Sequence, residues 1–333
     1  LSDLTIEQLA QIDVRSASKR DEPLSGAPAA LFVITGTEIE NSGLTRLPEV
    51  LRLAPNLQVS QVDAFQYAIS ARGFKGLQAG NKVLALIDGR SIYTPLGSTV
   101  FWQLHSPLVE DVRQVEVISG PGGTLYGPNA VNGVINVTTK DAQETIGTLA
   151  RGTIGPRERA AALRHGFALG GSGAMRVYAN WHDAEGLPAG MGGPIDDDHR
   201  GWQAGFRSDF STDADQITVQ GDLFRTRADT SPQDGAKGHN LLARWSRALS
   251  AASSFQVQAY YDWFKREAQR TDDSVQTLDL EGQFNATSGR HDFVAGAGVR
   301  RTSDEFVNEL NAFQLNPSRR RLWIYNAFVQ DHF

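Results

Sequence analysis

Residues 112–140 constrain the fold of this chain more than any other segment. Two runs rich in β-branched residues, Val115–Ile118 and Val134–Thr138, are too short for helices and predict buried strands. The connection between them carries glycine at positions 120, 122, 123, 127 and 133, and proline at positions 121 and 128. Glycine permits backbone conformations closed to other residues and proline fixes φ, so this composition predicts a rigid loop of defined shape.

The composition excludes several classes of function. The 333 residues contain no cysteine, which rules out a disulfide framework, a thiolate metal site and a cysteine nucleophile. The formal net charge of −6 gives no support to a nucleic-acid binder, because such proteins present a basic face. There is no apolar run of about 18 residues, so a transmembrane helix is excluded while membrane-spanning strands are still possible.

Helices and strands alternate up to about residue 140. Capping-box patterns at Thr5–Gln8 and Thr37–Glu40 predict two short helices, the second of which ends near Gly43. Apolar residues at helical spacing predict a third helix, which Pro55 stops (Leu47, Val50, Leu51, Ala54). This mixture predicts a compact α+β domain with a mixed sheet.

From Gly147 onward, the pattern changes to long segments of alternating polarity. In Gln216–Phe224 one face is apolar and the other is polar and acidic (Ile217, Val219, Gly221, Leu223 against Thr218, Gln220, Asp222). About ten segments show this pattern, near 147–155, 159–170, 173–184, 199–211, 215–228, 238–249, 253–267, 274–287, 291–303 and 320–332. The polar face suits a water-filled lumen, and the apolar face suits lipid.

A soluble antiparallel sandwich is the main alternative for this half, because it too has one polar face per strand. The predicted strands exceed the usual length of about five or six residues. Tryptophans lie in or near them, as the interface girdles of a membrane barrel require (Trp181, Trp202, Trp245, Trp263, Trp323). Both observations favour antiparallel transmembrane β-barrel strands.

Five motifs of the N-terminal part resemble, in their order and spacing, the plug domain of TonB-dependent outer-membrane receptors. They are a first strand, a helix-then-Pro segment, an Arg-Gly-Phe signature, an Asp-Gly hairpin and a Gly-Pro to Gly-Val-Ile-Asn block (Ala29–Thr35, Thr45–Asn56, Ile69–Phe74, Val83–Arg90 and 115–140). Chance matches rarely keep both order and spacing. The family usually carries Arg before Gly-Pro, and Ser119 stands there in this chain, so a salt-bridge latch at that point is missing.

The resemblance implies a domain organisation. It gives a periplasmic segment over residues 1–22 with an energy-coupling box, a plug domain over 23–142, and part of a β-barrel over 143–333. Barrels of this family have about 22 strands, and a plug does not fit inside a ring of ten. The chain is therefore expected to be the N-terminal part of a longer receptor, with a complete small barrel as the alternative.

The resemblance also implies a function. Such receptors import scarce bulky nutrients of the ferric siderophore, haem or cobalamin class through the Gram-negative outer membrane, by ligand binding at the plug apex and TonB-driven plug displacement. The plug faces the periplasm and the lumen. The expected partners are a TonB-type inner-membrane energy transducer, outer-membrane lipid and a small metal chelate, without nucleic acid. No catalysis and no resident cofactor are expected, and iron or cobalt belongs to the transported ligand.

Site residues follow from the same resemblance. Two apex loops, Val62–Tyr67 and Thr94–Trp102, are expected to meet the ligand with residues that combine flat rings and hydrogen-bonding tips (Phe65, Gln66, Tyr67, Ser98, Thr99, Trp102). The place of the energy-coupling segment is held by Ile12, Asp13, Val14 and Arg15, for which an ordered linker is the alternative. Arg72 and Glu116 are expected to latch the plug to the barrel, or else to form an ion pair within the plug.

Other chemistries find little support in the sequence. The glycines of 120–127 lack the Lys-Ser/Thr pair that a phosphate-binding loop requires. The acidic run Asp196–Asp198 beside His199 is expected to be a solvated loop rather than a calcium site, and no metal site is expected. A passive outer-membrane channel and a soluble β-rich carbohydrate-binding protein are the alternative functions.

Overall fold

The computed structural model describes residues 12–14, 22–26, 30–71, 82–120, 122–187, 197–229, 234–268, 271–307 and 314–333. The chain packs as two compact units. The first, here the N-terminal unit, holds the residues up to Gln61 together with Tyr67–Lys140. The second, here the strand unit, holds Asp141–Phe333 and the short segment Val62–Gln66. That segment packs with the strands although it interrupts the N-terminal unit in sequence.

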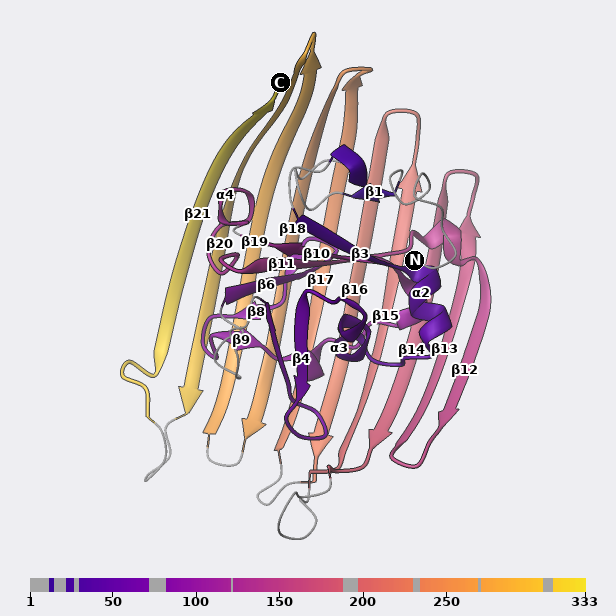
Figure 1. Cartoon of the computed structure of the whole chain (residues 1–333), viewed down its shortest axis with the longest axis vertical. Helices are drawn as coiled ribbons and strands as arrows, with labels where there is room; N and C mark the ends of the chain where they lie inside the picture. Colours follow the sequence, from indigo (N-terminus) through magenta and orange to yellow (C-terminus); the bar gives the residue numbers. More distant parts are fainter. Residues whose placement is uncertain are drawn as a thin grey trace. The chain divides into compact units, whose positions relative to one another are not determined.

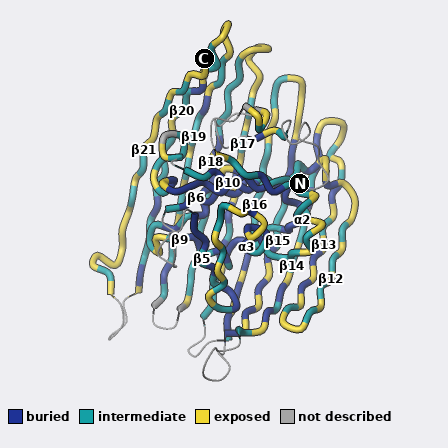
Figure 2. The backbone as a smooth tube through the Cα atoms, in the orientation of Figure 1, coloured by how far each residue is buried: buried dark blue, intermediate teal, exposed yellow. Residues whose placement is uncertain are grey.

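The N-terminal unit is built on a mixed sheet of five strands. Their spatial order is β3 (Ala30–Thr35), β10 (Val112–Ser119), β11 (Gly133–Thr139), β6 (Val83–Ile87) and β7 (Arg90–Ser91). Only β11 and β6 run parallel, and the other neighbours are antiparallel. The two predicted apolar runs are thus in the adjacent strands β10 and β11, and burial is continuous along β6 and over Val115–Ile118 of β10 (Figure 2). The predicted α+β domain with a mixed sheet is confirmed.

Short elements surround this sheet. The helices and helical turns are α2 (Gly36–Ser42), α3 (Leu47–Val50), α4 (Gly123–Tyr126), η1 (Leu24–Gly26), η2 (Leu51–Leu53), η4 (Trp102–Leu104) and η5 (Val109–Asp111). The strand pairs are β1 (Asp13–Val14) with β2 (Glu22–Pro23), β4 (Leu57–Gln61) with β5 (Tyr67–Ala71), and β8 (Tyr93–Thr94) with β9 (Thr99–Val100). In the described part of the chain no helix has the length and apolarity needed to cross a membrane.

The helix α2 begins two residues earlier than its sequence pattern predicts. Thr35 caps it: the Glu38 N–H donates to Thr35 Oγ1, and the Thr35 N–H donates to Glu38 Oε2 at 2.8 Å. The predicted box at Thr37 and Glu40 is wrong, because the strand β3 already ends at Thr35 and turns directly into the helix. The end at Gly43 is confirmed, where φ is +68° and glycine carries no penalty.

The Asp88-Gly89 turn joins β6 to β7 as predicted, with φ of +51° and +82°. The buried Asp88 carboxylate also accepts hydrogen bonds from Thr139 N at 2.9 Å and from Thr139 Oγ1 at 2.8 Å. The turn is therefore fastened to the end of β11, and a charged acceptor of this kind is among the stronger hydrogen-bonding groups.

The strand unit is a single antiparallel sheet of ten strands in sequence order (Figure 1). The strands are β12 (Gly147–Ile154), β13 (Glu158–Leu169), β14 (Gly173–Ala184), β15 (His199–Ser211), β16 (Asp215–Ala228), β17 (Asp234–Ser250), β18 (Ser253–Ala268), β19 (Thr271–Ser288), β20 (His291–Val307) and β21 (Arg319–His332). The short turn η6 (Ala142–Thr145) leads into β12. The strands thus form one sequential sheet and not the two packed layers of a sandwich.

The two faces of this sheet are inverted relative to a soluble protein, and burial alternates along strands such as β13 and β17 (Figure 2). On one face apolar side chains are exposed: Leu223 is 56% exposed and Leu280 is 49% exposed. On the opposite face polar side chains are buried: Gln203 is 4% exposed and Gln283 is 3% exposed. A contiguous exposed apolar face of this size is the pattern that the strands of membrane barrels present. The two faces are called the polar face and the apolar face below.

The two ends of the sheet differ in their connections. At one end every connection has two or three residues (170–172, 212–214, 251–252, 289–290). At the other end the connections include 185–198, 229–233 and 308–318. This end, at which the three longest connections lie, is called the long-loop end below, and outer-membrane barrels carry their longer loops on the extracellular side.

Aromatic side chains of the apolar face gather near both ends. Four tryptophans lie in the strand segments at the long-loop end (Trp181, Trp202, Trp263, Trp323). Phenylalanines and one tryptophan lie next to the short turns (Phe210, Trp245, Phe255, Phe284, Phe293). Rings in these positions suit the two headgroup regions of a bilayer, with the aliphatic band between them.

We expect His105 to make the N-terminal unit less stable in acid. Burial, together with the Arg90 guanidinium, holds the pKa of this imidazole well below its usual value. Below about pH 6.5 the unfolded chain binds a proton that the folded chain does not, so stability is present above that pH and declines as the pH falls. The opening free energy of the amides in β10 and β11 should therefore fall as the pH is lowered from 6.5 to 5.

Hydrogen exchange of the full chain in detergent measures this dependence. The variant His105→Gln should lose it, whereas the control His291→Gln, in the strand unit, should retain it. Equal slopes for the wild-type chain and His105→Gln would contradict the assignment.

Candidate functional site

The loop Val62–Gln66 between β4 and β5 is a tight turn organised by one carboxylate. Asp63 Oδ1 accepts hydrogen bonds from Phe65 N at 2.9 Å and from Gln66 N at 2.6 Å. The Val62 N–H donates to Gln66 O at 2.9 Å and closes the loop. An aspartate that accepts from the backbone two and three residues ahead is a common turn former, which explains the loop shape locally.

This loop is tied to the long-loop end of the sheet. Ala64 N donates to Asp197 Oδ2 at 2.8 Å, and Asp197 is only 2% exposed. The Phe65 ring stacks on the His199 ring with centroids 5.1 Å apart, and both side chains are buried. Ala64 and Phe65 also pack against Ala228 at the end of β16. One ionic hydrogen bond, one ring stack and one apolar contact therefore hold the loop on β15 and β16.

Buried charges and rings surround the contact between this loop and β15. Burial raises the pKa of the Asp63 carboxyl, and the nearby Asp197 carboxylate raises it further, while the N–H donors of Phe65 and Gln66 oppose both effects. Behind His199, the His182 Nε2 atom lies 3.2 Å from His199 Nδ1, and the two rings stack at 5.1 Å. The loop thus rests on a buried row of rings that runs from Phe65 through His199 to His182.

A second polar cluster anchors the chain where it enters the sheet. Arg207 of β15 forms ion pairs with Asp141 and with Asp209, the latter at 2.8 Å between Nε and Oδ2. Asp209 also accepts from Ala142 N at 2.7 Å and from Thr218 Oγ1 at 2.7 Å. The Arg207 and Asp209 side chains are about nine-tenths buried, so this anchor resists competition from water.

The polar face carries a further network between β14 and β17. Tyr178 Oη donates to Asp222 Oδ1 at 2.6 Å, Gln203 Nε2 donates to Tyr178 Oη at 2.6 Å, and Asn240 Nδ2 donates to Asp222 Oδ2 at 3.1 Å. Sequence reasoning placed Asp222 on this face and named His199 only beside the acidic run Asp196–Asp198, and it did not single out Arg207 or Asp209. Their signal was available, because each is a polar residue at an inward position of an alternating strand.

The residues predicted to meet a ligand fall into two groups. Tyr67 and Trp102 are 5% and 4% exposed and belong to the core of the N-terminal unit, as does Val100 beside Thr99. Tyr67, Thr99 and Trp102 line an internal void of about 10 Å³, which is no larger than one water molecule requires. Gln66 and Ser98 are more exposed, and Ser98 sits at a turn with φ of +49°. Phe101, expected to pack rather than to bind, is half-buried.

Glu116 is buried at 0% exposure in the middle of β10 and accepts from Gln114 Nε2 at 2.8 Å. Its predicted partner Arg72 lies outside the described residues, so the latch stays a prediction.

The acidic run is only partly described: Asp197 also accepts from Leu187 N at 3.2 Å, and Asp198 accepts from Gly186 N at 2.6 Å. Among the described residues no group of three His, Asp or Glu side chains is arranged to hold a metal ion.

The proposed energy-coupling segment is folded onto the N-terminal unit. Asp13 and Val14 pair with Pro23 and Glu22 in an antiparallel ladder, and Val14 is 1% exposed. Gln114 Nε2 donates to Asp13 O at 3.0 Å. Ile12 O accepts from Leu24 N at 2.8 Å, while Arg15 and the predicted helix at Thr5–Gln8 lie outside the described residues.

Comparison with known proteins agrees with this architecture. The family model for the TonB-dependent Receptor Plug Domain matches residues 23–134. The vitamin B12 transporter BtuB of Vibrio vulnificus is 33% identical over 179 residues, which cover 52% of this chain and 28% of that protein. An iron-regulated outer membrane virulence protein of Vibrio cholerae is 29% identical over 153 residues, which cover 44% of this chain and 23% of that protein.

The fold is also similar to a solved receptor. BauA, the ferric preacinetobactin receptor from Acinetobacter baumannii, superposes with a TM-score of 0.71 at 15% identity, covering 88% of this chain and 50% of that chain. The present chain spans less than a third of the length of the curated relatives it matches. With the ten-stranded sheet, these likenesses show a TonB-dependent receptor plug domain over residues 23–134, followed by ten antiparallel strands whose fold is similar to that of a solved receptor of this kind.

Proposed function

We propose that this chain is part of an energised importer that carries a scarce, bulky nutrient across the outer membrane. The observation that carries the proposal is the presence, in one chain, of a plug domain and of a sheet whose apolar face is turned to its surroundings. A passive channel has no use for a folded plug domain. A soluble carbohydrate-binding protein has no use for an exposed apolar face with aromatic rings near both ends.

The proposed cargo is a metal chelate of the cobalamin or ferric siderophore class. Support comes from the relatives, of which one is a vitamin B12 transporter and another a ferric preacinetobactin receptor. The polar face of the sheet, with its network around Tyr178 and Asp222, offers hydrogen-bonding groups to a hydrophilic solute. We propose ligand contact at Gln66, Ser98 and Thr99, of which Ser98 is exposed and the other two are partly exposed, whereas Phe65, Tyr67 and Trp102 are buried rings.

The loop Val62–Gln66 is the proposed link between ligand binding and the barrel wall. Ligand contact at Gln66 would act one residue away from Phe65, which stacks on His199, and two residues away from Ala64, which is bonded to Asp197. A shift of this loop therefore changes contacts with β15 at once, because the loop and the wall share a hydrogen bond and a ring stack.

The proposed partner is a TonB-type energy transducer of the inner membrane. The segment Ile12–Arg15 would be captured by β-augmentation, in which an extended peptide adds a strand to the edge of a partner's sheet. Asp13–Val14 already forms a short ladder with Glu22–Pro23, so capture by the partner would replace this internal ladder. Glu116 and Arg72 are proposed to hold the plug until force is applied.

Growth under nutrient limitation tests the import function. Cells that lack the full-length gene should fail to grow on a limiting chelate, tested separately with cobalamin and with ferric siderophores, and the gene should restore growth. Removal of the energy transducer should abolish uptake as well, because the import is driven. Uptake that persists without the transducer would support a passive channel instead.

A pull-down tests the energy-coupling segment. The variant Val14→Pro should fail to capture the C-terminal domain of the transducer.

The variant Asp197→Ala should loosen the loop Val62–Gln66. Loss of one charged acceptor for Ala64 N removes about 1.5–3 kcal/mol, so the amides of Ala64 and Phe65 should exchange about tenfold faster or more. Ligand affinity should fall with it. The matched control is Asp198→Ala, the neighbouring carboxylate, which bonds to Gly186 N and not to the loop. Unchanged loop exchange in Asp197→Ala would refute the proposed tie.

A further inference from the structure

Three basic side chains stand next to one another on the apolar face of the sheet. The register pairs Arg225 of β16 with Lys237 of β17, and Lys237 with Lys265 of β18. Neighbouring strands lie about 4.8 Å apart, and like charges directly opposite one another destabilise a sheet. These three residues, called the basic row, therefore need a counter-charge.

The protein supplies that counter-charge only in part. Lys265 Nζ lies 3.1 Å from Asp272 and 3.3 Å from Glu267. Within the described ranges no carboxylate forms an ion pair with Arg225 or Lys237, and both side chains are exposed. A shallow recess of about 110 Å³ opens beside them and is lined by all three members of the row.

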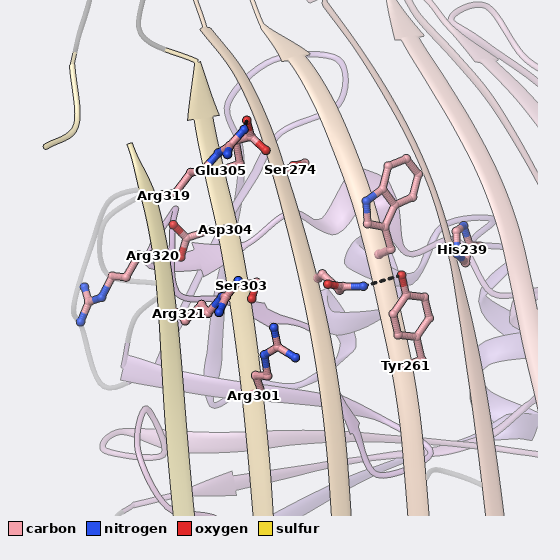
Figure 3. A pocket seen from close by; sticks show the side chains of 12 residues that line it. His239, Tyr261, Ser274, Arg301, Ser303, Asp304, Glu305, Arg319, Arg320 and Arg321 are labelled. Atoms are coloured by element: carbon pink, nitrogen blue, oxygen red, sulfur yellow. Dashed lines mark hydrogen bonds and ion pairs between the residues drawn. The ribbon is translucent and has the colours of Figure 1, made fainter. Parts of the chain in front are cut away.

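A larger recess continues on the same face towards β21 (Figure 3). It has a volume of about 860 Å³. Its lining combines rings from β17 and β18 with arginines from β20 and β21 (His239, Tyr261, Trp263; Arg301, Arg319, Arg320, Arg321). By the register, three of these arginines, Arg301, Arg319 and Arg321, share the apolar face with one carboxylate, Glu305, which is already bonded to Arg319 at 2.6 Å, while Asp304 and Arg320 alternate to the other face.

Two of these arginines are available to a ligand. The Arg301 guanidinium lies 5.8 Å from the centroid of the Trp323 ring, in a cation–π contact that orients it without neutralising it. In the part of the chain that the structure describes, neither Arg301 nor Arg321 has an ion-pair partner. On the opposite wall, Gln276 Nε2 donates to Tyr261 Oη at 3.0 Å, a bond drawn as a dashed line in Figure 3.

The basic row and the larger recess both lie at the boundary between the apolar band and the cell exterior. Leu223, two residues from Arg225 on the same face of β16, is 56% exposed, and Leu241 on β17 is 48% exposed. Beyond the basic row, towards the long-loop end, β16 ends at Ala228. The cations therefore sit at the depth of the lipid headgroups, with the apolar band below them and tryptophans such as Trp202 and Trp263 beside them.

We propose that this face of β16–β21 binds a phosphorylated lipid of the outer leaflet. Its phosphates contact the basic row and the pair Arg301 and Arg321, and its polar headgroup occupies the recess lined by Tyr261 and Trp263. Guanidinium groups match phosphate oxygens in geometry as well as charge, which makes arginine the fitting residue here. The lipid supplies the negative charge that the like-charged row lacks.

The occupant is a membrane lipid rather than the transported nutrient. The basic row and the recess are on the apolar face, whereas the polar network of Tyr178 and Asp222 is on the other face of the same sheet. A ligand that reaches this position comes from the headgroup region, where anionic groups are concentrated. The proposal depends on the assignment of the apolar face to lipid and does not depend on which nutrient is imported.

Lipid binding to the purified full-length receptor tests the proposal. The receptor in dodecyl maltoside is titrated with bis-phosphorylated lipid A, with enzymatically dephosphorylated lipid A, and with inorganic pyrophosphate, and bound lipid is counted by native mass spectrometry. The double variant Arg225→Gln/Lys237→Gln should bind phosphorylated lipid A about thirtyfold more weakly, since each basic residue near an anionic surface contributes about a fivefold effect. The difference should shrink as salt is raised.

The matched control is Arg247→Gln, a basic residue of the apolar face at the short-turn end of β17, 3.7 Å from Asp215. It should bind phosphorylated lipid A like the wild-type receptor. Equal affinity of the double variant and the wild type, or equal affinity for phosphorylated and dephosphorylated lipid, would overturn the proposal. Saturation of the site by micromolar pyrophosphate would overturn it too, because the ligand would then be a soluble anion.

Discussion

The rest of this structure depends on one constraint. Each interior strand of the sheet must be hydrogen-bonded to a neighbour on both sides, because the apolar face of the sheet is exposed. An exposed apolar face of ten strands is unfavourable in water and favourable in lipid. In lipid no water is available to backbone groups, so each must be bonded to a neighbouring strand. The ladders from β12 to β21 satisfy this need along long, nearly uninterrupted registers, with one irregularity between Ala248 and Ser250.

The polar face of the sheet is held together by buried polar groups. Its buried charges are paired and hydrogen-bonded, as in the cluster of Asp141, Arg207 and Asp209 and in the ion pair of Arg300 with Asp279 at 2.8 Å. Such groups are costly to bury unless they are satisfied, and a complete network specifies one arrangement. The loop Val62–Gln66 uses the same chemistry, because a buried carboxylate accepts its backbone N–H. The same sheet thus exposes apolar side chains on one face and binds the loop through buried polar groups on the other.

Sequence reasoning found all ten strands, because strict alternation of polarity over ten or more residues is typical of strands and rare in helices and loops. It placed some ends wrongly: β17 begins at Asp234 and β20 continues to Val307, whereas the pattern suggested 238 and 303. Residues 234–237 (Asp-Gly-Ala-Lys) and 304–307 (Asp-Glu-Phe-Val) do not alternate between polar and apolar side chains, so periodicity gives no signal there. The short helix α4 was also missed, because its glycine-rich start argued against any helix.

The candidate site was less predictable than the fold. The apex position of Phe65 and Gln66 came from family resemblance, but nothing in the residues Asp-Ala-Phe-Gln showed that the loop packs with the strand unit through Asp197 and His199. Contacts between residues more than a hundred positions apart leave no local pattern. The basic row was equally hidden, since Arg225, Lys237 and Lys265 become neighbours only once the register of β16–β18 is fixed.

The most direct measurement of the central claim is the environment of each face in a bilayer. Single nitroxide labels at positions 223 and 280 report on the apolar face, and labels at positions 220 and 283 report on the polar face, in the full-length receptor reconstituted in lipid. The account predicts that oxygen, which concentrates in hydrocarbon, relaxes the labels at 223 and 280 more strongly than a water-soluble nickel chelate does. Preferential relaxation of those two labels by the nickel chelate would contradict it.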